Sequence, residues 1–138
     1  MIPRILLVDD DEPVRAAIQM WLERAGFDLV VAESGESALA LCRSTVFDLM
    51  VIDMVMPGMG GLKAIELIRR VAPAMPIIAV SGFMFADSPS AYSDFPKLAQ
   101  AAGATLCLRK PFRPSELVAQ IRRCLGPAQQ PVDAAAAS

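Results

Sequence analysis

The fold of this chain is decided by its residues 5–26, ILLVDDDEPVRAAIQMWLERAG. Four apolar residues are followed at once by three aspartates, and apolar residues then recur three or four positions apart. Such a short apolar run is typical of a strand buried in a parallel sheet, and the later spacing is typical of an amphipathic helix. Pro13 falls in the first turn of that helix, where proline is tolerated, and Gly26 is placed to end it. The stretch predicts a strand, a short acidic loop and a helix in direct succession.

The alternation of strand and helix continues along the chain. Further short apolar runs predict strands at residues 29–32, 49–52, 77–80 and 106–108. Capping residues and helical spacing predict helices at residues 34–42, 62–68, 97–102 and 114–125, with a long loop at residues 83–96. Because right-handed crossovers place helices on both faces of a parallel sheet, we expect an α/β fold with a five-stranded, doubly wound parallel sheet. We assign residues 1–126 to this domain and residues 127–138, rich in Ala, Pro and Gln, to a disordered tail.

The composition excludes several classes of function. The chain has 138 residues, 54% of them apolar, which is enough for one domain with a sizeable core but not for two. Its 13 basic and 15 acidic side chains give a net charge of −2, which argues against direct binding to nucleic acid. Charged residues interrupt every apolar run before it reaches the length of a membrane span or signal peptide, so we expect a cytoplasmic protein with no membrane insertion. The chain has no histidine, which excludes Ser-His and Cys-His catalysis.

Polar residues follow the predicted strands at the end where parallel sheets bind ligands. They are Asp9, Asp10 and Asp11 after the first strand, and Asp53, Ser81, Lys110 and Pro111 after three others. Carboxylates that converge at one place repel each other unless a cation holds them together, and magnesium prefers hard oxygen ligands. We therefore expect Asp10 and Asp53, assisted by Asp9, to bind Mg²⁺.

The other residues at this edge suit the transfer of a phosphoryl group. Lys110 is a compact cation that can hold a phosphoryl oxygen, and the Ser81 hydroxyl can donate a hydrogen bond to another. The Asp53 carboxylate is then the nucleophile that forms an acyl phosphate. The metal and Lys110 would offset the charge that develops on the transferred group.

Each of these residues also has a plain structural interpretation. On their own, the acids at residues 9–12 are more typical of a solvated helix cap, and a serine after a strand is more often a turn residue. Asp53 and Lys110, in register with them, favour a functional site. Side chains that we expect to pack as ordinary hydrophobes are Met54, Met56, Met59, Cys42, Cys107 and Cys124.

Five sequence motifs, in this order along the chain, resemble the receiver domain of response regulators in two-component signalling. They are LLVDDD at residues 6–11, DLMVIDMVMPGMGG at residues 48–61, Val80-Ser81-Gly82, Ala102-Gly103-Ala104 and Lys110-Pro111-Phe112. The resemblance covers about residues 5–125 and implies the flavodoxin-like (βα)5 receiver fold, of the CheY-like type.

The resemblance also implies a reaction and a partner. Asp53 would accept a phosphoryl group from a phosphohistidine on a histidine kinase or a histidine phosphotransfer protein. Asp9 and Asp10 match the acidic pair that binds magnesium, and the backbone carbonyl of Val55 matches the main-chain ligand of the metal.

Three further residues match the family pattern. Ser81 matches the hydroxyl that moves toward the phosphoryl group, and Lys110 matches the family's lysine. Pro111 in that pattern follows a cis peptide bond, which would aim the Lys110 side chain inward.

The chain departs from the family pattern in several places. Cys107 stands where the family often has a Tyr or Phe that reports phosphorylation, and Gly60 stands where an Asp is usual. The 29 positions from Ser81 to Lys110 are several more than usual, and the extra length carries four aromatic residues, Phe83, Phe85, Tyr92 and Phe95. We weigh a packed lid and a partner-binding patch equally for these aromatics. Apolar Val55 and Phe83 would not orient an attacking water, so we expect slow loss of the phosphoryl group.

Our leading hypothesis is a single-domain response regulator whose phosphorylation switches its protein contacts, with a kinase, a phosphotransfer protein or a separate output protein as partner. Under this hypothesis, the protein is not an enzyme and carries out only its own phosphorylation and slow autodephosphorylation. The alternative is a degenerate receiver that binds proteins without phosphorylation. A phosphatase of the haloacid-dehalogenase type would need a second acid where Val55 stands, and Asp9 to Asp11 would repel the phosphate of a flavin.

Overall fold

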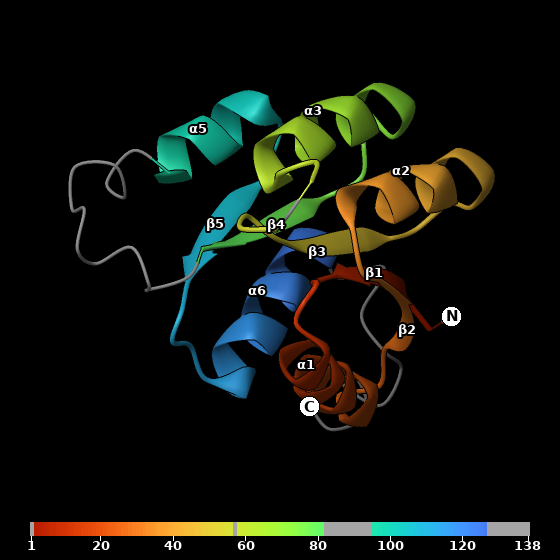
Figure 1. The fold of residues 1–138 in the computed structure, drawn as a ribbon. Coiled ribbons are helices and arrows are strands. Elements are labelled where there is room, and N and C mark those ends of the chain that lie inside the picture. Colours follow the sequence, from red (N-terminus) through yellow and green to blue (C-terminus); the bar gives the residue numbers. More distant parts are fainter. Residues whose placement is uncertain (1, 57, 82–94, 127–138) are drawn as a thin grey trace.

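A five-stranded parallel sheet with helices on both faces is formed by the residues that the computed structural model describes, which are 2–56, 58–81 and 95–126 (Figure 1). The strands are β1 Arg4–Val8, β2 Asp28–Ala32, β3 Leu49–Asp53, β4 Ile77–Ser81 and β5 Leu106–Arg109. They lie in the order β2-β1-β3-β4-β5, and every neighbouring pair is parallel. The predicted fold class is confirmed.

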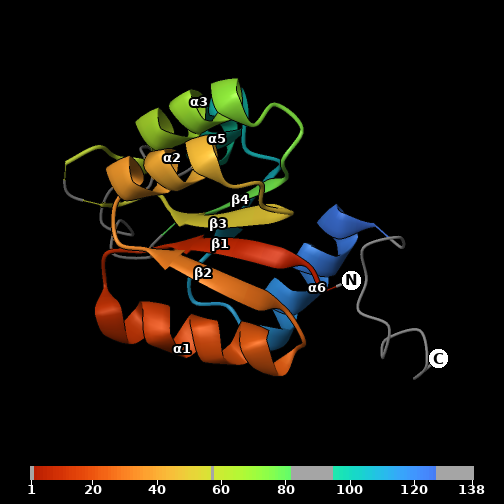
Figure 2. The ribbon, with the colours of Figure 1, turned by 90° about the vertical axis from the view of Figure 1, so that its right-hand side faces the viewer.

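The helices cover the sheet from both sides. They are α1 Glu12–Arg24, α2 Gly35–Ser44, α3 Gly61–Val71, α5 Phe95–Ala102 and α6 Pro114–Leu125. In Figures 1 and 2, α2, α3 and α5 lie on one face and α1 and α6 on the other. The predicted boundaries hold to within three residues, and the largest difference is at the end of α3, which continues from Ile68 to Val71.

Local sequence signals explain where the helices begin. The Ser34 side chain accepts a hydrogen bond from the Ser37 N–H at 3.1 Å, which caps α2 as predicted. Pro114 occupies the first turn of α6, where its missing N–H costs nothing. These signals act within a few residues, so they are readable in the sequence.

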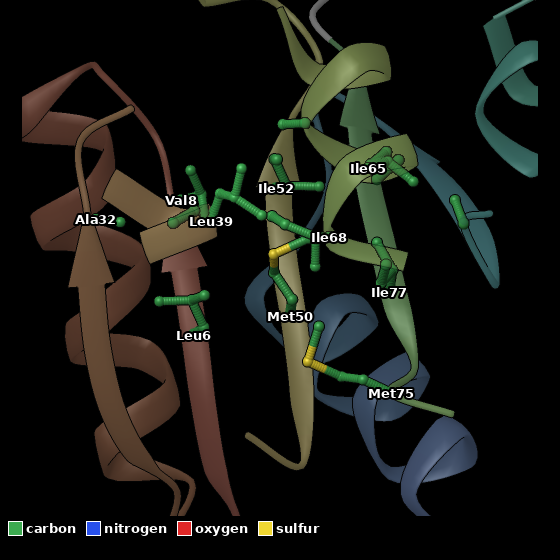
Figure 3. Packing of buried hydrophobic residues seen from close by; sticks show 14 of the residues in the cluster. Leu6, Val8, Ala32, Leu39, Met50, Ile52, Ile65, Ile68, Met75 and Ile77 are labelled. Atoms are coloured by element: carbon green, nitrogen blue, oxygen red, sulfur yellow. The ribbon is translucent and has the colours of Figure 1, made fainter. Parts of the chain in front are cut away.

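The central strands divide their apolar side chains between two cores. In β1, Leu6 and Val8 pack against α2, α3 and α5, whereas Ile5 and Leu7 pack against α1 and α6. Figure 3 shows the first of these cores, where Ile68 lies close to β3. Every residue of β3 and β4 is buried, so the two strands form a close-packed platform at the centre of the sheet.

The two edge strands are less buried than their sequences predict. Leu106, Cys107 and Leu108 of β5 are half-buried, and Val31 of β2 is 37% exposed. The reason is the strand order, which places β2 and β5 at the two edges of the sheet. Apolar runs on edge and central strands look alike in the sequence, because position in the sheet is set by packing between distant segments.

The strand order also fixes where a ligand can bind. β1 lies between β2 and β3, so the chain leaves β1 toward one side of the sheet and returns on its other side. In doubly wound sheets, ligands bind beyond the carboxyl ends of the strands at such a reversal. Asp9 and Asp53 lie at the carboxyl ends of β1 and β3, at this reversal.

Two predicted segments, most of the loop at residues 83–96 and the tail at residues 127–138, lie outside the described residues. The aromatic residues Phe83, Phe85 and Tyr92 belong to that part of the chain. Among the described residues, no helix combines the length and apolar character that a membrane crossing requires.

One arginine ties the end of α3 to the connection between α5 and β5. The Arg69 guanidinium donates hydrogen bonds to the carbonyl oxygens of Ala72 (2.9 Å), Met75 (2.6 Å) and Gly103 (3.1 Å). Gly103 has a φ of +127°, and a Cβ there would lie 3.1 Å from Arg69 Cγ. The close approach of the Arg69 side chain to the main chain at Gly103 therefore requires both the arginine and the glycine.

We predict that Arg69→Ala lowers the free energy of unfolding by about 2–4 kcal/mol, because several half-buried carbonyl groups lose a charged donor. Denaturant unfolding followed by circular dichroism measures this change. Arg70→Ala is the matched control, because Arg70 is the exposed neighbour on the same helix. Equal effects of the two substitutions would contradict the role given to Arg69.

Candidate functional site

The three aspartates after β1 have different environments. Asp9 is 2% exposed, and its N–H extends the sheet by donating to the Ala32 carbonyl at 3.1 Å. Asp11 is exposed, and its side chain caps α1 by accepting a hydrogen bond from the Val14 N–H at 3.2 Å. Asp10, between them, is also exposed. The structural interpretation as a helix cap is thus right for Asp11, whereas Asp9 faces the site.

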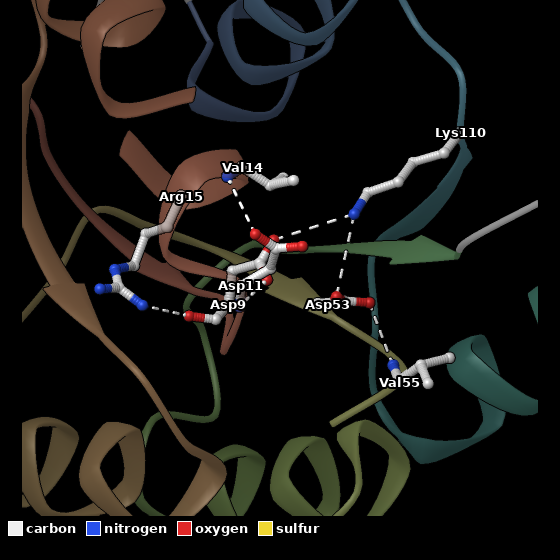
Figure 4. Close-up of polar contacts among 7 residues, drawn as sticks. All are labelled: Asp9, Asp11, Val14, Arg15, Asp53, Val55 and Lys110. Carbon is white, nitrogen blue, oxygen red and sulfur yellow. Dashed lines mark hydrogen bonds and ion pairs between the residues drawn. The ribbon is translucent and has the colours of Figure 1, made fainter. Parts of the chain in front are cut away.

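Asp53 is the last residue of β3 and is 8% exposed. Its Oδ1 accepts a hydrogen bond from the Val55 N–H at 3.0 Å (Figure 4). The next residue, Met54, donates its N–H to the Val80 carbonyl of β4 at 2.9 Å. The loop after β3 therefore holds the Asp53 carboxylate through the Val55 N–H, and the hydrogen bond from Met54 holds this loop against β4.

A glycine lets α3 begin directly against this strand end. A Cβ at Gly61 would lie 2.6 Å from Met54 Cα and 2.9 Å from the Asp53 carbonyl oxygen, which is closer than real Cβ atoms approach. The sequence indicates no role for Gly61 beyond its place at the end of the motif at residues 48–61. Its close contact with the main chain that carries Asp53 appears only once α3 is packed on β3.

Lys110 reaches across the sheet edge to two carboxylates. Its Nζ lies 3.8 Å from Asp9 Oδ2 and 3.8 Å from Asp53 Oδ2, as Figure 4 shows. The Lys110 N–H donates to the Ser81 carbonyl at 2.8 Å, which joins the residue after β5 to the end of β4. The Lys110–Pro111 peptide bond is cis, as the resemblance implied.

The acidic side chains fit a magnesium ion. One carboxylate oxygen from each of Asp9, Asp10 and Asp53 lies within 4.8 Å of the others. Two oxygens on opposite sides of one Mg²⁺ are about 4.2 Å apart, so small shifts or a bridging water would complete the ligand set. These three residues could hold the ion, whereas the Val55 carbonyl remains a predicted ligand.

Burial dominates the electrostatics of the site. The pKa of Asp9 is raised to about 6, and loss of water is the largest cause. The hydrogen bond from the Asp11 N–H and the charge of Lys110 oppose this rise, whereas the charges of Asp53 and Asp10 add to it. Burial also raises the pKa of Asp53, opposed by the hydrogen bond from Val55 and by Lys110. Mutual repulsion, which the sequence suggested as the cause, contributes less than burial.

Ser81 lies beside Lys110 and on the same face of the sheet as Cys107. It is 4% exposed at the end of β4, and Ala79 pairs with Cys107 in the register with β5. Ser81 and Cys107 therefore point to the same face of the sheet. Burial raises the pKa of the Cys107 thiol, and its hydrogen bond with the Ser81 side chain opposes that rise. A main-chain hydrogen bond thus joins Ser81 to Lys110, and the Ser81 side chain lies on the same face of the sheet as that of Cys107.

Arg15 contacts the acidic residues after β1, although no motif in the sequence includes it. Its Nη1 donates a hydrogen bond to the Asp9 carbonyl oxygen at 2.8 Å. The contact spans six residues and depends on where α1 begins, so only the position of the Asp11 cap could have indicated it.

Known proteins resemble this chain in sequence and structure. The sequence pattern of the family described as "Response regulator receiver domain" matches residues 5–122. Response regulator UvrY of Escherichia coli (strain K12) is 38% identical over 120 residues, which are 86% of this chain and 52% of UvrY. Autoinducer 1 sensor kinase/phosphatase LuxN of Vibrio harveyi is 39% identical over 80 residues, which are 58% of this chain and 9% of LuxN. The chain thus spans about half the length of UvrY and a small part of LuxN.

A solved structure shows the same fold. The crystal structure of a CheY-like response regulator receiver domain protein from Methanospirillum hungatei JF-1 has a TM-score of 0.79 to this chain at 28% sequence identity. The match covers 91% of this chain and 94% of the other. The structural similarity therefore extends over most of this chain.

We predict that Asp9→Asn stabilises the metal-free protein at neutral pH. Because folding raises the pKa of Asp9 from 3.8 to about 6, the folded state binds this proton more tightly, and the contribution of Asp9 to stability falls as the pH rises through that range. Asparagine keeps an oxygen that can accept from the Asp11 N–H, so the gain in unfolding free energy is up to about 3 kcal/mol.

Denaturant unfolding with a chelator, at neutral pH and near the ordinary carboxyl pKa, measures this effect. Asp11→Asn is the matched control, because it removes a charge from the same loop and asparagine also caps helices well. A gain that is the same at both pH values, or the same for both variants, would contradict the prediction.

We predict that Gly61→Ala destabilises the protein by about 1–3 kcal/mol, because the added methyl group must displace the main chain at Met54. Gly60→Ala is the control, since a Cβ at Gly60 meets nothing within 4 Å. Its effect should stay below about 1 kcal/mol. Thermal unfolding of both variants measures the difference, and equal effects would show that the contact at Gly61 is not tight.

Proposed function

We propose that this chain, which belongs to the response regulator receiver domain family, accepts a phosphoryl group on the carboxylate of Asp53. The chain is a receiver domain of a two-component response regulator, a family whose members are generally not classical enzymes. The assignment of Asp53 as the phosphoryl acceptor rests on one observation. Its Oδ1 is held by the Val55 N–H, and its Oδ2 faces Lys110 beside the carboxylates of Asp9 and Asp10.

The proposed donor is a phosphohistidine on a partner histidine kinase or histidine phosphotransfer protein. An Asp53 oxygen attacks the phosphorus atom, the P–O bond forms, and the P–N bond to the imidazole breaks with its electron pair leaving on the nitrogen. The imidazole then takes up a proton. This proton comes from the solvent, and the product is an acyl phosphate on Asp53.

Lys110 opposes the negative charge that the phosphoryl group brings. Its ammonium group lies 3.8 Å from Asp53 Oδ2, so a small movement brings it to a phosphoryl oxygen. Asp9, Asp10 and Asp53, with the Val55 carbonyl, would hold Mg²⁺, which supplies further positive charge at the phosphoryl oxygens when it is bound. Lys110 and the acidic side chains thus prepare the site for an incoming anion.

Ser81 is the group that we expect to respond to phosphorylation. Its buried hydroxyl would donate a hydrogen bond to a phosphoryl oxygen. The Ser81 carbonyl already accepts a hydrogen bond from the Lys110 N–H. A movement of Ser81 would therefore also displace the main chain at the end of β5. The altered surface would then change the protein contacts of the chain, in the manner of a switch.

The relatives support the class of partner. LuxN is described as a sensor kinase/phosphatase and UvrY as a response regulator, and both contain a segment similar to this chain. We expect slow autodephosphorylation, because the half-buried side chain of Val55 near the carboxylate is apolar and cannot orient a water molecule. Contact with a partner without phosphorylation is the competing function.

We predict that incubation with Mg²⁺ and acetyl phosphate adds one phosphoryl group, because Asp53 is the carboxylate that faces Lys110. Intact-mass spectrometry measures the adduct, which Asp53→Asn and a chelator should each abolish. Asp11→Asn is the matched control and should still form it. No adduct on folded wild-type protein, either from acetyl phosphate or from a phosphorylated histidine kinase, would favour the phosphorylation-independent module.

A further inference from the structure

We propose that Arg15 is a positioning residue for the magnesium site, which it serves by fixing the main chain of the acidic loop, residues 9–11. This inference rests on the proposed function, because it concerns the metal that the phosphoryl transfer uses. Arg15 lies in the second turn of α1 and is half-buried. Its guanidinium donates to the Asp9 carbonyl oxygen and not to a carboxylate.

The Asp9 carbonyl lies just beyond the hydrogen bonds of the sheet. β1 pairs with β2 and β3 up to Val8, and the Asp9 N–H makes one further bond, to Ala32. The carbonyl oxygen of the same residue accepts a hydrogen bond from Arg15 Nη1 at 2.8 Å. A charged donor to a carbonyl makes a stronger bond than a neutral one, so this contact fixes the direction in which the chain leaves β1.

The first turns of α1 hold the loop at two points. The Asp11 side chain accepts from the Val14 N–H, and Arg15 reaches back to Asp9. Asp10, between these two anchors, is exposed, and the hydrogen bonds among the described residues do not include its carboxylate. The place of the Asp10 carboxylate is therefore set by the main chain on either side of it.

The contact acts through position more than through charge. Figure 4 shows Arg15 and Lys110 on opposite sides of Asp9, and the Asp9 carboxylate that faces the site is turned toward Lys110. Outer groups that orient metal ligands commonly change metal affinity when they are removed.

Magnesium titration without a phosphodonor, by isothermal titration calorimetry, tests the proposal. Arg15→Met keeps most of the side-chain stem and removes the donor, and we expect it to weaken Mg²⁺ binding about tenfold. Arg15→Lys keeps the charge but lacks the reach and planar geometry of the guanidinium, so it should recover only part of the affinity. Arg24→Ala, at an exposed position on the same helix, is the control and should bind Mg²⁺ like the wild type.

The rate of adduct formation at different Mg²⁺ concentrations gives a second measurement. Arg15→Met should need about tenfold more Mg²⁺ for its half-maximal rate and should approach the wild-type rate at saturation, because Asp53 and Lys110 are unchanged. A purely structural role would lower the maximal rate or the folded fraction and leave the Mg²⁺ affinity of the folded protein as it was, which would overturn the proposal. If Arg15→Met does not fold, the Mg²⁺ affinity and the maximal rate of Arg15→Lys are compared with those of the wild type instead.

The two proposals fail in different ways. Unchanged Mg²⁺ affinity in both Arg15 variants, with a normal adduct on the wild type, would overturn the role of Arg15 alone. Weakened Mg²⁺ binding in Arg15→Met, with no adduct on the wild type from any donor, would support Arg15 and overturn the phosphorylation of Asp53. Full recovery of affinity by Arg15→Lys would show that charge, not position, is what Arg15 supplies.

Discussion

The burial of two carboxylates around one lysine is the constraint on which the rest of this structure depends. Asp9 and Asp53 have lost most of their water, and burial raises the pKa of both. Lys110 stands 3.8 Å from each and offsets part of their repulsion, and the N–H groups of Asp11 and Val55 each hold one further oxygen. One lysine between three acids leaves negative charge in excess, so the site suits a further cation.

The frame that holds these charges is made of apolar packing and main-chain contacts. β3 and β4 are buried along their whole length, and the loop after Asp53 is tied to β4 through the Val80 carbonyl. Gly61 allows α3 to begin against the same strand end, without room for a side chain. On the other side of the sheet, α1 holds the acidic loop through the Asp11 cap and Arg15. A rigid frame of this kind keeps like charges close that would otherwise move apart.

The sequence predicted much of this arrangement, and its omissions have physical causes. The strands, the helices and the convergence of Asp9, Asp10, Asp53 and Lys110 follow from short-range patterns and from the rule that parallel strands bind ligands at their carboxyl ends. It did not indicate that burial is the largest cause of the raised pKa values of Asp9 and Asp53, because the extent of burial depends on how tightly the layers close. It also did not indicate that Ser81 and Cys107 lie on the same face of the sheet. The register between β4 and β5, which places these two residues on one face, cannot be read from the sequence of either strand alone.

The sequence by itself determined which residues form each element and which chemical groups stand at the strand ends, because apolar periodicity, proline, glycine and capping residues act within one or two turns of the chain. Only the tertiary structure decided which strands lie at the edges, which aspartate caps α1 and which faces the site, and that Arg15 and Gly61 support it. Those outcomes depend on contacts between segments far apart in sequence or on the exact turn at which a helix begins. A few tenths of an ångström in packing then decide whether a carboxylate, a carbonyl or a Cβ can occupy a given place.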